Sequence, residues 1–120
     1  MRSLLVVFMV LIATPLFAHP PKSVDLDYDA ETGILSIEIA HSVNVASKHY
    51  IHKVVVEVNG KKHVEQNFKR QTDNEQQHAI YKLIDVEGGD KITVTAYCSI
   101  SGRRKGELEV TFKKDEEINE

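Results

Sequence analysis

Apolar residues alternate with polar ones along most of this chain, and this period of two constrains the fold more than any other feature. In ILSIEIA (34–40), Leu35, Ile37 and Ile39 occupy every second position, and segments 91–100 and 106–112 repeat the pattern. Successive side chains of a β-strand point to opposite faces, so these segments are typical of strands with one buried face. Further strands are predicted at 24–29, 50–58, 63–69 and 77–84.

Turn signals separate these segments. Asn59-Gly60, between two predicted strands, is the strongest short hairpin signal, and the glycine-containing stretches 87–90 and 101–106 punctuate the last strands. About seven short strands in roughly 100 residues predict an all-β fold, an immunoglobulin-like antiparallel β-sandwich. The pattern predicts that nine residues mostly face inward: Leu35, Ile37, Ile39, Val54, Val56, Ile92, Val94, Leu108 and Val110. By the same parity, Cys98 and Ile100 share the apolar face of their strand.

The first eighteen residues have the organisation of an export signal. Arg2 gives a positive start, residues 4–13 are apolar, and Ala18 is a small residue suited to cleavage before His19. The apolar stretch is short for a membrane span, which needs about 20 residues. We therefore expect a signal peptide (1–18), one sandwich domain (19–114) and a charged C-terminal tail (115–120), with a periplasmic or secreted product that is free of the membrane after cleavage. A retained N-terminal anchor is the alternative.

Charge and cysteine content argue against two classes of protein. The chain has 15 Lys and Arg against 18 Asp and Glu, without the basic stripe that nucleic-acid binding needs. Its single cysteine, Cys98, rules out a disulfide framework. A lone thiol in an exported protein is open to oxidation, so Cys98 is either a small buried core residue or a metal ligand.

The histidines raise the question of metal binding, since no catalytic triad or phosphate-binding loop is present. His41 ends one predicted strand, His49 begins the next, and a loop of seven residues connects them. Such a unit can bring both imidazoles to one end of a sandwich, where Cys98, from another strand end, would complete a metal constellation. The remaining internal histidines are interpreted as solvated or partly buried side chains: His52, His63 and His78.

His19 has a special position if cleavage follows Ala18. It then becomes the N-terminus and offers an imidazole and a free α-amine as a chelating pair, with Pro20 and Pro21 stiffening the arm behind it. In the precursor the same nitrogen is an amide. The alternative is a frayed terminus.

Four segments together resemble the superoxide reductase family, which includes neelaredoxin and the iron-centre domain of desulfoferrodoxin. They are HPP (19–21), AHSV (40–43), KHYIHKV (48–54) and AYCSISG (96–102). The family has an early His-x-Pro, a His-Pro followed shortly by His-Tyr-Ile, and a late Tyr-Cys-Asn-x-His-Gly. The resemblance covers nearly the whole chain after residue 18, in order, and implies an immunoglobulin-like sandwich with one non-haem iron bound by four histidines in a plane and an axial cysteine.

Carried over residue by residue, the resemblance implies four metal ligands: His19, His41, His49 and Cys98. Several features depart from the family pattern. Ser42 replaces the proline that follows the histidine matched by His41. Ser101 stands in place of the fourth histidine, Ser99 replaces the asparagine, and the loop before His49 is about two residues longer than usual. The lysine that steers superoxide in the family has no aligned counterpart here, and Lys48, beside His49, is the candidate for that catalytic role.

Together with the export signal, the resemblance implies an exported iron protein that reduces superoxide, or binds another small anion, with an electron donor that the sequence does not identify. Serine is a poor ligand for Fe(II), so two alternatives stay open: a non-catalytic periplasmic protein that binds iron, copper or zinc, and a metal-free sandwich that binds another protein. Three imidazoles and one thiolate could form a tetrahedral zinc site. An N-terminal histidine could chelate copper. Oligomeric state is not predicted.

Overall fold

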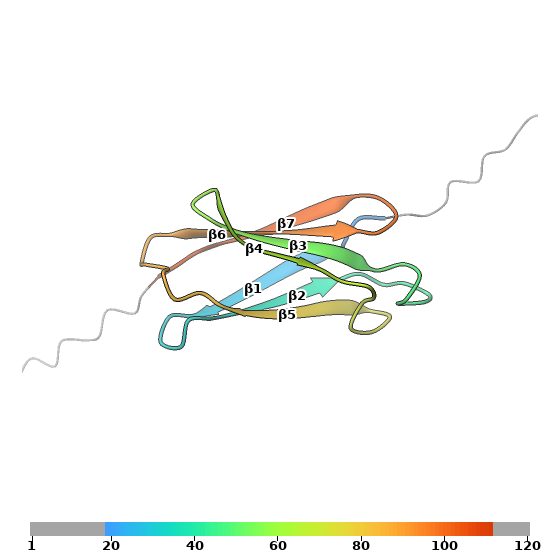
Figure 1. Cartoon of the computed structure of the whole chain (residues 1–120), viewed down its shortest axis with the longest axis horizontal. Helices are drawn as coiled ribbons and strands as arrows, with labels where there is room; N and C mark the ends of the chain where they lie inside the picture. Colours follow the sequence, from blue (N-terminus) through green and yellow to red (C-terminus); the bar gives the residue numbers. More distant parts are fainter. Residues whose placement is uncertain (1–18, 112–120) are drawn as a thin grey trace, which may run out of the picture.

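The computed structural model describes residues 19–111, which form two antiparallel sheets packed face to face (Figure 1). The three-stranded sheet has the order β1-β2-β5, and the four-stranded sheet has the order β4-β3-β6-β7. The strands are β1 (Ser23–Asp29), β2 (Ile34–Ala40), β3 (Ile51–Val58), β4 (Lys61–Asn67), β5 (Gln76–Lys82), β6 (Lys91–Cys98) and β7 (Arg103–Glu109). The predicted all-β immunoglobulin-like sandwich is confirmed.

Some sequence predictions fall on residues that the structure does not describe. The signal peptide (1–18), the charged tail (115–120) and the last residues of the predicted domain (112–114) lie outside residues 19–111. Within 19–111, no helix is long and apolar enough to cross a membrane.

The core lies between the sheets and follows from the alternation in the sequence. On β2, Leu35, Ile37 and Ile39 are at most 2% exposed, because every second side chain points toward the other sheet. They meet inward-facing residues of the two central strands opposite, among them Val54 of β3 and Val94 of β6. Of the nine residues predicted to face inward, eight are buried and Leu108 is partly buried at the edge of the core.

Three predicted strand boundaries are wrong. Ile100 is 53% exposed, because β6 ends at Cys98 and the following residues turn toward β7. The stretch 101–106, interpreted as a turn, belongs mostly to β7, where Arg103 pairs with Tyr97 and Gly106 with Val94. The strand predicted at 63–69 begins at Lys61, because the Asn59-Gly60 turn is tight: both residues have positive φ, 52° and 80°, as two-residue hairpins require.

A bulge in β3 breaks its simple alternation. The pairing of β3 with β6 shifts register between Ile51 and Lys53, so His52 is the extra residue of the bulge. Both Ile51 and Val54 are therefore buried in the core, although they are three positions apart. The shift brings Ile51 opposite Cys98 at the end of the sheet.

Gly106 allows the two sheets to approach each other closely at one edge. A Cβ atom on Gly106 would overlap the carbonyl oxygen of Val24, so a larger residue would push β1 away from β7. This contact closes the sandwich along β1 and β7.

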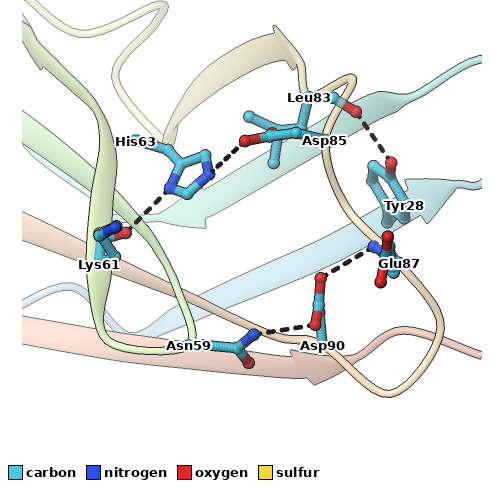
Figure 2. A network of polar contacts seen from close by, with 8 residues as sticks. All are labelled: Tyr28, Asn59, Lys61, His63, Leu83, Asp85, Glu87 and Asp90. Atoms are coloured by element: carbon cyan, nitrogen blue, oxygen red, sulfur yellow. Dashed lines mark hydrogen bonds and ion pairs between the residues drawn. The ribbon is translucent and has the colours of Figure 1, made fainter.

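A polar network ties the elements together at the Asn59-Gly60 end of the sandwich (Figure 2). The side chain of Asn59 donates to Asp90, whose carboxylate also accepts from the backbone N–H of Glu87. His63 on β4 lies 3.0 Å from both the Lys61 carbonyl and Asp85, in the loop after β5. A carbonyl and a carboxylate only accept hydrogen bonds, so both contacts are made at once by the protonated imidazolium.

These contacts predict a pH-dependent contribution of His63 to stability. The Lys61 carbonyl, and then the Asp85 carboxylate, raise the pKa of His63 above its ordinary value, although burial opposes them. A histidine whose pKa is raised on folding stabilises the fold fully below its unfolded pKa of about 6.5, and this gain is lost as the pH rises through the folded pKa. Replacing Asp85 with Asn should therefore lower the free energy of unfolding more at about pH 5.5 than at about pH 8.5, by less than about 1 kcal/mol because the pair is partly exposed.

Urea unfolding at the two pH values measures this difference. Glu65→Gln is the matched control: Glu65 pairs with Lys62 at 3.8 Å and the pair contains no histidine, so its effect should not change with pH. Equal effects of Asp85→Asn at both pH values would contradict the assignment.

Candidate metal centre

The candidate site is a cluster of three residues, His41, His49 and Cys98. It lies at the end of the sandwich opposite the Asn59-Gly60 turn. β2 and β6 end there, β3 begins there, and the described chain starts at the same end (Figure 1). His41 directly follows β2, His49 precedes β3 by two residues, and Cys98 is the last residue of β6. Their possible ligand atoms all lie within 4.8 Å of one another. The prediction that His41, His49 and Cys98 lie close together at one end of the sandwich is confirmed.

The loop between His41 and His49 is held by the connection between β4 and β5. The backbone N–H of His41 donates to Glu75 O at 2.9 Å, and that of Val43 donates to Asn74 O at 2.7 Å. The side chain of Asn74 accepts a hydrogen bond from the Ala46 backbone at 3.0 Å. The loop then turns tightly into β3, with the N–H of His49 donating to Val45 O. Both histidines are thus fixed on a backbone with satisfied hydrogen bonds.

Ser99 fastens the start of β3 to the end of β6. Its backbone N–H donates to Tyr50 O at 2.8 Å, and its hydroxyl accepts from the Tyr50 backbone N–H at 3.1 Å. Tyr50 follows His49 and Ser99 follows Cys98, so this reciprocal pair sets the distance between the two site residues. Ser99, identified from the sequence only as a departure from the family pattern, therefore has a structural role.

His49 and Cys98 are in direct contact. Nε2 of His49 lies 3.1 Å from Sγ of Cys98, which is 5% exposed. Burial lowers the pKa of His49, and the neighbouring His41 and His19 lower it further. A lowered pKa keeps the imidazole neutral near pH 7, the form in which its nitrogen can bind a metal.

Gln71 orients the ring of His41, and sequence analysis did not identify it. Both residues are almost fully buried, at 2% and 1% exposed. The amide nitrogen of Gln71 donates to the carbonyl oxygens of His41 and Asp73, so its Oε1, 2.7 Å from Nδ1 of His41, is the acceptor of an Nδ1–H. In a singly protonated ring, Nε2 of His41 would then carry the lone pair. In metal sites, an imidazole that binds the ion through one ring nitrogen typically donates the N–H of its other ring nitrogen to such an acceptor.

His19 lies next to the cluster without belonging to the group of converging ligand atoms. Its ring centre is 5.1 Å from that of His41 and 5.5 Å from that of His49. Its carbonyl oxygen lies 3.4 Å from Nε2 of His41. The structure thus brings three of the four predicted ligands together and places the fourth beside them, while metal binding itself stays a prediction.

The other internal histidines and Lys48 do not belong to the group of converging atoms. His52 lies beside Tyr97, 6.2 Å between ring centres, and Tyr97 alternates with the inward-facing Cys98 on β6. His63 belongs to the network of Figure 2, and His78 is exposed on β5. Lys48 is exposed in the turn before His49, and its role in steering an anion stays a prediction.

The cluster fits a metal ion by size and chemistry. With metal–ligand bonds of about 2.0–2.3 Å, two ligands of one ion lie up to about 4.6 Å apart, so separations of at most 4.8 Å need little adjustment. Imidazole and thiolate are ligands for iron, zinc and copper, and their types alone do not choose among them. The Nε2 lone pair of His41 also faces the carbonyl oxygen of His19. Both atoms are hydrogen-bond acceptors, so they face each other without a donor unless a cation or a proton lies between them.

We expect Gln71→Ala to weaken metal binding without removing a ligand. Loss of the Oε1 acceptor frees the His41 ring to rotate and to change tautomer, and loss of such outer partners lowers metal affinity about 10- to 100-fold. Competition with a chromophoric chelator measures this change. Gln77→Ala is the matched control, because Gln77 is equally buried but hydrogen-bonds to Thr72 and the His78 carbonyl; it should lower stability and leave affinity unchanged. Equal loss of affinity in both variants would contradict the positioning role.

Comparison with known proteins supports the fold. The sequence matches no protein-family model and no curated protein. Among solved structures, the chain is similar to the superoxide reductase (1Fe-SOR) from Giardia intestinalis, with a TM-score of 0.58 and 15% sequence identity over 77% of this chain and 100% of that one. At this identity, the likeness shows the fold alone: the chain has a superoxide-reductase-like β-sandwich.

Proposed function

We propose that this chain is an exported metal-binding protein that holds one iron ion through His19, His41, His49 and Cys98 and uses it to reduce superoxide. The observation that carries this proposal is the convergence of two imidazoles and a buried thiol at one end of the sandwich, within 4.8 Å of one another. The likeness to the Giardia superoxide reductase supports it, because the two chains share the fold.

Each residue has a role that follows from its position. Neutral His49 and the Nδ1–H form of His41 present ring nitrogens with free lone pairs. Cys98 is shielded from solvent, which protects its sulfur from oxidants. Burial also restricts the movement of its side chain, as suits a metal ligand. Exposed Lys48, next to His49 in sequence, would supply a positive charge that attracts a small anion.

Bound iron would supply one electron to superoxide, which takes up two protons to leave as hydrogen peroxide, and an external donor would then restore Fe(II). The chain would contribute a buried cysteine sulfur whose electron density tunes the metal. Export fits the sequence of residues 1–18 and a site that meets superoxide outside the cytoplasm.

A closed zinc site without catalysis is the second candidate. Ser101 stands where the family has a fourth histidine, which leaves three imidazoles and one thiolate, the ligand set of a tetrahedral structural zinc ion. Metal identity separates the two candidates, because zinc has no redox chemistry.

The test is metal analysis of the protein purified anaerobically without a histidine tag. We expect about one metal ion per chain, and a loss of affinity in His41→Ala and Cys98→Ser that exceeds the roughly 10- to 100-fold effect of outer partners. His78→Ala is the control, because His78 is exposed on β5 and should not matter. Iron-loaded protein should accelerate superoxide decay. Unchanged metal content in His41→Ala and Cys98→Ser would overturn the site, and bound iron without superoxide decay would overturn the activity.

A further inference from the structure

The arm that precedes β1 is docked against the sandwich rather than free. Pro21 is fully buried, and its carbonyl oxygen accepts a hydrogen bond from Nε of Arg104 on β7. Pro20 packs on Gly102, where a Cβ atom would lie 2.9 Å from the Cβ of Pro20. The backbone N–H of Lys22 donates to Ala40 O at 2.7 Å. Contacts on three successive residues therefore fix the direction in which the chain reaches His19.

This docking brings the backbone of His19 to the cluster. Its carbonyl oxygen is 3.4 Å from Nε2 of His41, the atom whose lone pair is free for a metal. A backbone nitrogen lies within about 4 Å of the carbonyl oxygen of its own residue, because only Cα and C separate them. Rotation about the Cα–C bond of His19 moves its nitrogen and its side chain without disturbing the docked prolines.

The chemical state of that nitrogen depends on processing. Residue 18 is alanine at the end of an export signal, so cleavage after it makes His19 the first residue. An amide nitrogen shares its lone pair with the carbonyl and is a poor metal ligand, whereas an amine has a free lone pair. An N-terminal histidine can bind one ion through its amine and Nδ1 together, in a single chelate ring.

We propose that the α-amine of His19, created by cleavage after Ala18, is a metal ligand, and that the site is complete only in the processed protein. This proposal rests on the proposed metal-binding function and adds a fifth donor to the four side chains. Metal loading then follows export, because the precursor holds an amide at this position.

The experiment compares three forms of the chain ending at residue 120. The first begins at His19, the second begins at Ala18, and the third begins at His19 with its amine acetylated. The affinities for Fe²⁺, under anaerobic conditions, and for Zn²⁺ are measured by competition with a chelator. We expect the second and third forms to bind at least about tenfold more weakly than the first, on the scale of lost metal-site partners. Their unfolding midpoints without metal should agree, because all three forms keep the docking contacts of residues 20–22.

A second pair of chains isolates the chelate. With His19→Ala, the extension by Ala18 should change affinity less than it does in the native sequence, because no imidazole remains to close the ring. Equal affinities of the three native-sequence forms, with binding still lost in Cys98→Ser, would overturn the amine ligand and leave the proposed metal site standing. Weakening by the extension but not by acetylation would also overturn it. Failure of every form to bind metal would overturn both proposals.

Discussion

β3 and β6 pair antiparallel along nearly their whole length at the centre of the four-stranded sheet, and both the core and the candidate site depend on this pairing. Its inward residues, including Val54 and Val94, form one wall of the core. At its end, the register shift sets Ile51 opposite Cys98, and the Tyr50–Ser99 hydrogen bonds continue the pairing beyond the strands. The 3.1 Å contact between His49 and Cys98 is the result.

Burial of polar groups beside the core has a cost that the structure offsets with hydrogen bonds. His41 and Gln71 are buried within a domain that has only about 100 residues to form its core. An unpaired buried polar group costs about 1–3 kcal/mol, and the His41–Gln71 pair avoids this through three hydrogen bonds of the glutamine amide. A buried histidine that only filled space would be replaced by an apolar residue at lower cost, which favours a ligand role for His41.

Much of the fold follows from the sequence because alternation and turn chemistry are local. Leu35, Ile37 and Ile39 indicate a strand by themselves, and Asn59-Gly60 specifies its hairpin through positive φ angles. The bulge at His52 and the early start of β7 could not be predicted in this way, since they depend on cross-strand register and on the contact of Gly106 with Val24. His41, His49 and Cys98 were identified by their places at strand ends together with the family resemblance. Gln71 was missed, because it is 30 residues from His41 in sequence and carries no motif.

The central claim is that Cys98 and the histidines at this end of the sandwich bind one metal ion. X-ray absorption at the iron edge of the iron-loaded chain tests it most directly, because sulfur and nitrogen neighbours are distinguished by distance and scattering. The account predicts one sulfur at about 2.3 Å and several nitrogen neighbours at about 2.0–2.2 Å, with the sulfur absent in Cys98→Ser. A shell of only oxygen and nitrogen in the unsubstituted protein would contradict it.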